Sequence, residues 1–167
     1  MKKPELLAPA GSFEKAKVAF MYGADAVYCG TASLSLRSRA EVDDDDLEKT
    51  IKYAHSIGKK VYAALNIYAW DTNYEEIEKQ VKMLDEVHVD AIIASDGGVI
   101  QKIREIAPNI EIHVSTQANV VSYHSAKFWY DQGVKRIVLA RELSLKEIKE
   151  CHDNLPEECD LEAFVHG

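Results

Sequence analysis

The sequence predicts an α/β fold of the TIM-barrel-like (β/α) type, incomplete, with about seven parallel strands. Short β-branched runs alternate with amphipathic helical patterns along the 167 residues, and this alternation demands parallel strands joined by right-handed helical crossovers. A Gly-x-Gly-x-x-Gly motif would favour a doubly wound open sheet, but the first expected turn, "APAGSFEKA", has a single glycine. The segments "GADAVYCG", "VDAIIASDGG" and "GVKRIVLAREL" each place a small turn before an apolar strand that ends in polar residues, which indicates a repeated (β/α) unit.

The expected strands are short runs bounded by turn residues. In chain order they are residues 5–11, 26–30, 60–67, 91–95, 111–116, 136–140 and 161–165. These runs are one fewer than the eight strands that close a barrel of this type. We therefore expect either a gap between the first and last strands or self-association of chains through the open sheet edges.

The helical patterns between the strands begin with capping residues. Four consecutive aspartates precede one apolar-periodic run, where carboxylates complement the positive end of a helix. The spacing of Asn73 with Glu76, and of Ser144 with Glu147, is typical of capping boxes. The helix-starting residues are predicted to be Ser12, Asn73, Asp96 and Ser144, and a further helix is expected after the aspartates at 43–46.

Composition indicates one domain over residues 1–167. Hydrophobic residues make up 47% of the chain, and no stretch rich in Ser, Pro or Gly divides it. No run approaches the ~18 consecutive apolar residues of a membrane helix, so no membrane contact is expected. The cysteines at positions 29, 151 and 159 provide neither a disulfide framework nor a paired metal site, which favours a cytoplasmic location.

The charge of the chain argues against strong nucleic-acid binding by this segment alone. Twenty basic and 28 acidic side chains leave a formal net charge of −8, and the basic residues do not cluster. Such a surface repels phosphate backbones. We therefore expect a small molecule or a peptide as the substrate.

Strand periodicity assigns side chains to the two faces of the barrel wall. The outward face packs under helices and is apolar, which fits Ile112 and Val114. Their neighbours His113, Ser115 and Gln117 then point toward the barrel axis.

The same parity places further polar side chains in the interior. Asn66 and Tyr62 point inward from the strand at 60–67, and Glu5 opens the first strand on the same side. In the last segment Leu161, Ala163 and Val165 are expected to face outward, which turns Glu162, Phe164 and His166 inward.

Convergence of imidazole, amide and carboxyl groups on one axis is unusual for a packed core, and it predicts a polar substrate pocket at the carboxyl ends of the strands. The expected catalytic residues are His113, Glu162 and His166, which are also candidate ligands of a divalent metal. The expected substrate-binding residues are Asn66, Asp96, Ser115, Gln117, Asn119, Arg141 and Glu142. An alternative is a hydrogen-bonded polar plug with a rim ion pair between Arg141 and Glu142.

Several motifs together resemble one family. The segments "ELLAPAGS", "GADAVYCG", "IHVSTQANV", "LAREL" and "EAFVHG" are similar to the amino-terminal part of the collagenase-like peptidase family, peptidase family U32, over essentially the whole chain. The family signature begins with a Glu, a Phe and a Gly that match Glu162, Phe164 and Gly167. In the family it continues into closely spaced cysteines.

The resemblance implies first a peptidase, to which this domain would supply the substrate pocket. A second expectation follows from members that resemble iron–sulfur-dependent, oxygen-independent hydroxylases acting on RNA bases or on a quinone ring. A non-catalytic binding module is the third alternative. The 167 residues contain neither a Gly-x-Ser-x-Gly elbow nor a His-Glu-x-x-His helix, so the metal arrangement above is the one proteolytic centre that the sequence offers.

The resemblance also implies a fragment that is cut just before the cysteine-containing signature. We expect the parent protein to be an enzyme and the fragment to be inactive alone. No cofactor is expected within the fragment, whereas the parent is expected to carry an iron–sulfur cluster or, in the alternative, a divalent metal.

Overall fold

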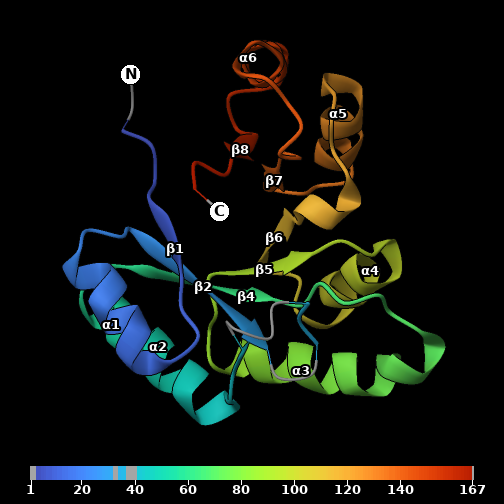
Figure 1. The fold of residues 1–167 in the computed structure, drawn as a ribbon. Coiled ribbons are helices and arrows are strands. Elements are labelled where there is room, and N and C mark those ends of the chain that lie inside the picture. Colours follow the sequence, from blue (N-terminus) through green and yellow to red (C-terminus); the bar gives the residue numbers. More distant parts are fainter. Residues whose placement is uncertain (1–2, 32–33, 37–40, 167) are drawn as a thin grey trace.

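A computed structural model describes residues 3–31, 34–36 and 41–166, and their strands form one curled parallel sheet (Figure 1). The strand order is β1 (Leu7–Pro9), β2 (Ala26–Thr31), β4 (Lys60–Ala64), β5 (Ala91–Ala94), β6 (Glu111–Val114), β7 (Arg136–Val138) and β8 (Asp160–Glu162). A two-residue strand, β3 (Glu41–Val42), pairs with β2 beside this path. The sheet is a half-barrel that ends at β1 and β8, so the predicted incomplete barrel is confirmed. The predicted self-association stays a prediction.

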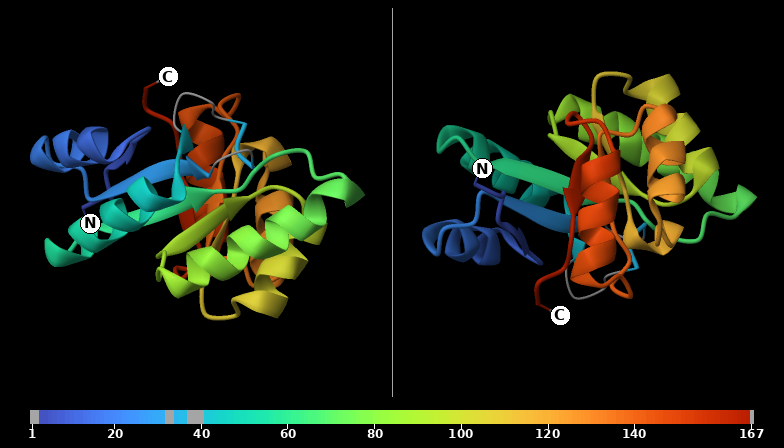
Figure 2. Two further views of the ribbon diagram at one scale, coloured as in Figure 1. Left: turned by 90° about the horizontal axis from the view of Figure 1, so that it is seen from below. Right: turned by 90° about the horizontal axis from the view of Figure 1, so that it is seen from above.

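Six α-helices of the described chain lie around the outside of the curled sheet (Figure 1). They are α1 (Phe13–Met21), α2 (Asp44–Ser56), α3 (Tyr74–Glu86), α4 (Gly97–Ile106), α5 (Tyr123–Asp131) and α6 (Leu145–Asn154), with single 3₁₀ turns η2 (Asp71–Asn73) and η3 (Thr116–Ala118). Contacts join α1 with α2, α3 with α4, and α5 with α6 (Figure 2). None of the helices in the described ranges has the length and apolar character needed to cross a membrane.

One helix-to-strand turn recurs along the chain, which confirms the predicted repeat. After α1, α2, α3 and α5 a backbone N–H bonds to the carbonyl five residues earlier, at N···O distances from 2.8 to 3.2 Å. This turn requires a left-handed residue before the donor. Glycine supplies it after α1, α2 and α5, whereas His88 adopts it after α3 with a φ of 58°.

The two faces of the sheet differ as the periodicity predicts. Outward residues such as Val61, Ile92 and Ile137 are fully buried in one continuous apolar cluster beneath the helices. The inward face of the central strands carries several alanines together with the larger side chains of Tyr62 and Ile93; these residues are Ala26, Tyr62, Ala64, Ala91 and Ile93. Small inward side chains leave room for the strands to curl toward one another.

The last strand is shorter than predicted. β8 ends at Glu162, whose carbonyl accepts a hydrogen bond from the Leu139 N–H at 2.9 Å. Glu162 pairs with Val138, where β7 also ends, so the following residues have no ladder to continue. Val165, expected beneath the helices, is 92% exposed, and the predicted inward pattern is wrong beyond Glu162.

The predicted helix starts are confirmed with one exception. Ser12, Asp43, Asp96 and Ser144 each accept a backbone N–H from the first turn of a helix, and Ser144 makes the reciprocal capping box with its N3 glutamate. The Asn73 side chain instead accepts from the N–H of the residue three positions earlier, at 2.9 Å within η2, so it does not cap α3.

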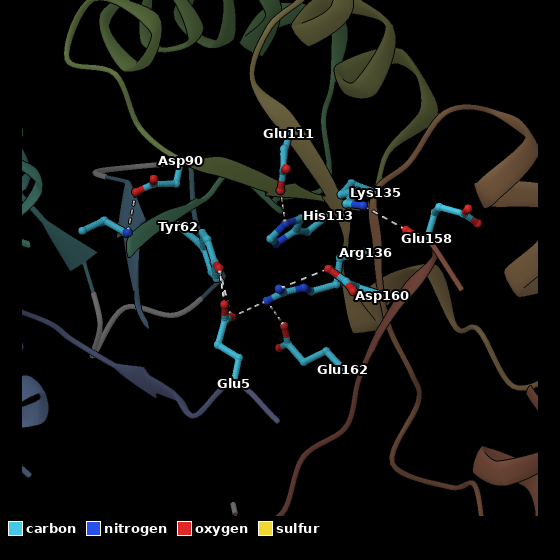
Figure 3. Close-up of polar contacts among 11 residues, drawn as sticks. Glu5, Tyr62, Asp90, Glu111, His113, Lys135, Arg136, Glu158, Asp160 and Glu162 are labelled. Carbon is cyan, nitrogen blue, oxygen red and sulfur yellow. Dashed lines mark hydrogen bonds and ion pairs between the residues drawn. The ribbon is translucent and has the colours of Figure 1, made fainter. Parts of the chain in front are cut away.

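Charged side chains from the segment before β1 and from β7 and β8 converge on one another in the half-barrel interior (Figure 3). Arg136, the first residue of β7, is 9% exposed. Its Nη1 donates to Glu5 Oε1 at 2.6 Å and lies 3.8 Å from Glu162 Oε2. Its Nη2 lies 3.5 Å from Asp160 Oδ2, and the Tyr62 hydroxyl donates to Glu5 Oε1 at 2.9 Å. These five residues are called the Arg136 cluster below.

Burial and pairing shift the pKa values of the Arg136 cluster in opposite directions. Burial raises the pKa of Glu162 above its ordinary value, because Arg136 offsets only part of the desolvation. Burial acts in the same direction on Glu5, but the hydrogen bond and charge of Arg136 outweigh it and lower the pKa of Glu5. Desolvation of Arg136 is likewise outweighed, chiefly by Glu5, and its pKa is raised. Arg136 therefore stays charged.

His113 lies beside the Arg136 cluster and is fully buried. Its ring packs edge-on against Tyr62, with ring centroids 4.7 Å apart. Nε2 lies 3.6 Å from Glu111 Oε2, which is too long for a hydrogen bond, and neither ring nitrogen has a hydrogen-bond partner among the described residues. Burial lowers the pKa of His113, with Arg136 adding to the effect and Glu111 opposing it, so the ring is neutral.

Replacing Arg136 with Met preserves much of the side-chain volume but leaves Glu5 and Glu162 without their cation. We expect the free energy of unfolding to fall by about 2–4 kcal/mol, toward the lower end because Glu5 is partly exposed. Urea unfolding followed by circular dichroism measures the loss. Lys127→Met removes an exposed ion pair with Asp131 and should leave the free energy of unfolding nearly unchanged, because water screens exposed pairs. Equal losses in the two variants would contradict the importance of the Arg136 cluster.

The lowered pKa of His113 predicts a loss of stability in acid. Below about pH 6.5 the unfolded chain protonates this imidazole while the folded chain does not, so stability falls by up to about 1.4 kcal/mol per pH unit until the folded pKa is reached. His113→Phe should lack this component, whereas the exposed His152→Gln should retain it. Urea unfolding near neutral pH and about one unit below pH 6.5 compares the variants. An unchanged acid dependence in His113→Phe would refute the assignment.

Candidate functional site

The carboxyl ends of β4, β5 and β6 border an open hollow of about 350 Å³. The loops that follow these three strands supply its walls, and active sites of (β/α) barrels occupy this edge because such loops converge there. The lining residues are Ile67, Tyr68, Ala69, Trp70, Ser95, Asp96 and Gln117. Two of the predicted substrate-binding residues, Asp96 and Gln117, therefore reach one hollow.

Asn66, Ser115 and Gln117 form a hydrogen-bonded group at this edge. Asn66 Nδ2 donates to Ser115 Oγ and to Gln117 Oε1, at 3.3 Å each. The Ser115 hydroxyl also donates to Gln117 Oε1. Asn66 and Ser115 are 4% exposed, whereas Gln117 is half-buried and lines the hollow. The structure brings these predicted residues together, and their role in substrate binding stays a prediction.

One carboxylate oxygen of Asp96 has a structural role as the cap of α4. This oxygen, Oδ1, accepts the N–H groups of Gly98 and Val99, at 2.8 and 3.0 Å. The same oxygen accepts the Tyr74 hydroxyl at 3.3 Å. Oδ2 has no hydrogen-bond partner in the described part of the chain. Tyr74 has no signal in the sequence that distinguishes it from any other aromatic residue at the start of a helix.

Tyr68 and Trp70, in the loop after β4, lie on the outside of the molecule. The sequence allows them either to line a ligand site or to cover the core. Their exposed fractions are 75% and 73%, and both border the hollow. The two rings therefore do not cover the core, and their role in binding a ligand stays a prediction.

Asn119, Arg141 and Glu142 are exposed and do not line the hollow. Asn119 has a left-handed backbone with a φ of 54°. The Arg141 guanidinium carbon lies 5.7 Å from the centre of the Phe164 ring. No ion pair joins Arg141 to Glu142 among the contacts of the described residues, so the predicted rim ion pair is not formed.

The predicted catalytic residues do not assemble into a metal site. Glu162 belongs to the Arg136 cluster and His113 lies beside it, while His166 is exposed beyond the end of β8. Within residues 3–31, 34–36 and 41–166, no three His, Cys, Asp or Glu side chains are grouped as ligands of one metal ion. The predicted metal arrangement is therefore wrong, because parity gives the face of a strand and not the depth of a residue along the barrel.

Comparisons with known proteins point to one family. The model of Peptidase family U32 matches residues 11–167; the last of these, Gly167, lies outside the described residues. The tRNA hydroxylation protein P of Haemophilus influenzae is 45% identical over 99% of this chain, which corresponds to 36% of that protein. A 23S rRNA 5-hydroxycytidine synthase of Escherichia coli is 36% identical over 98% of this chain, or 24% of that protein.

Solved structures show the same fold. The structure of a U32 peptidase superimposes with a TM-score of 0.76 and 15% sequence identity, covering 96% of this chain and 70% of the other. The chain spans little more than a third of the length of the tRNA hydroxylation proteins of Haemophilus influenzae and Escherichia coli that it matches. From the match of the family model over residues 11–167, the chain belongs to peptidase family U32.

Proposed function

We propose that this chain is part of an RNA-hydroxylating protein and that the carboxyl edge of β4, β5 and β6 contributes to its substrate site. The observation that carries the proposal is the similarity, over nearly the whole chain, to a tRNA hydroxylation protein and to an rRNA hydroxycytidine synthase. The hollow beside Asn66 and Gln117 supports it, because single-stranded bases are recognised by amide hydrogen bonds and aromatic stacking.

The expectation of a peptidase is wrong. It followed from the name of the family, whereas the two relatives described above, 45% and 36% identical to this chain, are named for hydroxylation of tRNA and for synthesis of 5-hydroxycytidine in rRNA. A shared fold does not fix the reaction, since the function depends on the site. The arrangement of His113, Glu162 and His166 that would have supplied a hydrolytic metal is not formed.

The cysteines of this chain do not fit an iron–sulfur cluster. Such clusters are held by closely spaced thiolates, but Cys29, Cys151 and Cys159 are buried and belong to no group of three metal-binding side chains among the described residues. Burial raises the pKa of Cys29 to about 12 and that of Cys159 to about 11, so both remain protonated thiols. On the proposed function, the thiolates of any cluster in the longer protein come from other residues.

The charge of the chain bears on how RNA is held. A formal charge of −8 repels phosphates, so we assign to this chain contacts with a base rather than with the backbone. A chain that contacts a base but not the phosphate backbone is expected to bind nucleic acid weakly when it is alone. Free, buried thiols and an RNA substrate both fit a cytoplasmic location.

Nucleoside analysis tests the proposed function. Cells that lack the gene for the parent protein should lose a hydroxylated nucleoside from digested tRNA or rRNA, and the intact gene should restore it. Mass spectrometry detects the extra oxygen atom. A parent carrying the exposed-surface change Lys79→Ala should restore it equally well. An unchanged nucleoside profile would overturn the proposal.

A further inference from the structure

The strongest unassigned feature is the pair of exposed aromatic side chains beside the hollow. Tyr68 and Trp70 leave 75% and 73% of their surfaces exposed, although burying an aromatic ring is favourable. They border the same hollow as the polar side chains Asp96 and Gln117. Aromatic rings next to a few polar groups are typical of a ligand site.

The backbone of this loop is fixed although its side chains are exposed. Leu65 N–H donates to the Ile93 carbonyl at 2.9 Å, which anchors the start of the loop to β5. At its other end, the Trp70 N–H donates to Asn73 Oδ1 at 2.9 Å, and the Asn73 N–H donates to the Trp70 carbonyl at 2.8 Å. The rings therefore extend from a backbone that is held at both ends.

The hydrogen bonds of Asn66 fix which atoms of Gln117 are used. The Leu36 backbone N–H is a donor by necessity, and it donates to Asn66 Oδ1 at 3.1 Å. Asn66 Nδ2 is then the group that faces Gln117, so it must meet the carbonyl oxygen of that side chain. Gln117 Oε1 accepts this bond and one from Ser115. The Gln117 amide nitrogen remains, without a partner among the described residues.

The hollow thus offers a donor and an acceptor to a ligand. The donor is the Gln117 NH₂ group, and the acceptor is Asp96 Oδ2, which the cap of α4 leaves unused. A ligand that uses both must present a carbonyl or ring nitrogen together with an N–H group. The edge of a nucleobase has this combination, and its face stacks on aromatic rings.

We propose that Tyr68 and Trp70 form a stacking platform for a single RNA base, and that Gln117 donates a hydrogen bond to an acceptor on the edge of that base. The assignment rests on the proposed function, which supplies RNA as the substrate class. Asn66 and Ser115 act as positioning residues, because they hold the Gln117 carbonyl and thereby direct its NH₂ group. A quinone ring also has a flat face and carbonyl oxygens, but it lacks the N–H group that Asp96 would accept.

Tryptophan fluorescence of the 167-residue chain tests the platform. The sequence contains two tryptophans, so Trp129→Phe leaves Trp70 as the single reporter. Uridine and cytidine serve as uncharged probes, with ribose as the control for the sugar. Either nucleoside should quench Trp70 saturably, and ribose should not. Quenching by ribose, no quenching by any nucleoside, or tighter binding of a water-soluble quinone would overturn the proposal.

Two variants separate stacking from hydrogen bonding. Tyr68→Ala should weaken nucleoside binding about fivefold or more, because one face of the stack is lost. Gln117→Glu keeps the oxygen that Asn66 and Ser115 require but replaces the donor with an acceptor, and should weaken binding about tenfold. Tyr22→Ala removes a ring that is 87% exposed and lies outside the hollow. This variant should bind nucleosides as tightly as the unsubstituted chain. Circular dichroism verifies that each variant is folded.

The outcomes distinguish this inference from the proposed function. If nucleosides bind equally well to Tyr68→Ala, Gln117→Glu and the unsubstituted chain while hydroxylation in cells depends on the gene, the platform is refuted and the function stands. If the gene leaves RNA hydroxylation unchanged, the proposed function fails whatever the nucleosides do.

Discussion

The guanidinium of Arg136 is the charge around which the half-barrel interior is organised. Glu5 precedes the first strand, whereas Asp160 and Glu162 belong to the last, and Arg136 contacts all three. β1 and β8 are the open ends of the sheet, so this cluster joins them across the interior where no strand ladder does. Burying charges is expensive unless they are paired, and the pairing therefore depends on keeping the sheet curled. Amino-terminal interior positions in such barrels contribute to stability, while the carboxyl edge is left for chemistry.

Periodicity predicted the face of each strand well. Tyr62, Asn66, His113 and Ser115 lie on the predicted side, because apolar neighbours must pack beneath the helices. The depth of a residue along the barrel was not predictable, since it depends on the register between strands. Two side chains on the same face, such as those of His113 and Gln117, consequently belong to different clusters. Arg136 did not stand out in the sequence, because this residue begins a run that is otherwise apolar. A signal was available, since β6 and β8 also begin with a charged residue, Glu111 and Asp160.

The motifs identified the family and left the reaction open. "EAFVHG" and its companions give the same family as the comparison over residues 11–167, but a family name describes ancestry and not chemistry. The residues already disfavoured proteolysis, because neither a nucleophile elbow nor a metal-binding helix occurs in the sequence. The acidic charge predicts weak contact with phosphates, but the small molecule or peptide that it led us to expect differs from the RNA for which the relatives are named.

The orientation of amide groups is a further property that a sequence does not contain. Asn66 and Gln117 each carry a donor and an acceptor, and composition alone does not tell which one faces the hollow. The Leu36 backbone N–H fixes the orientation of the Asn66 amide, because it donates to Asn66 Oδ1. The Asn66 Nδ2 group then fixes the orientation of the Gln117 amide. Leu36 comes from the segment after β2, Asn66 follows β4 and Gln117 follows β6, so the polarity of the hollow is set jointly by three segments of the fold. On the proposed stacking platform, a change that displaces the Leu36 N–H or replaces Asn66 would release the Gln117 donor without altering a residue that touches the base.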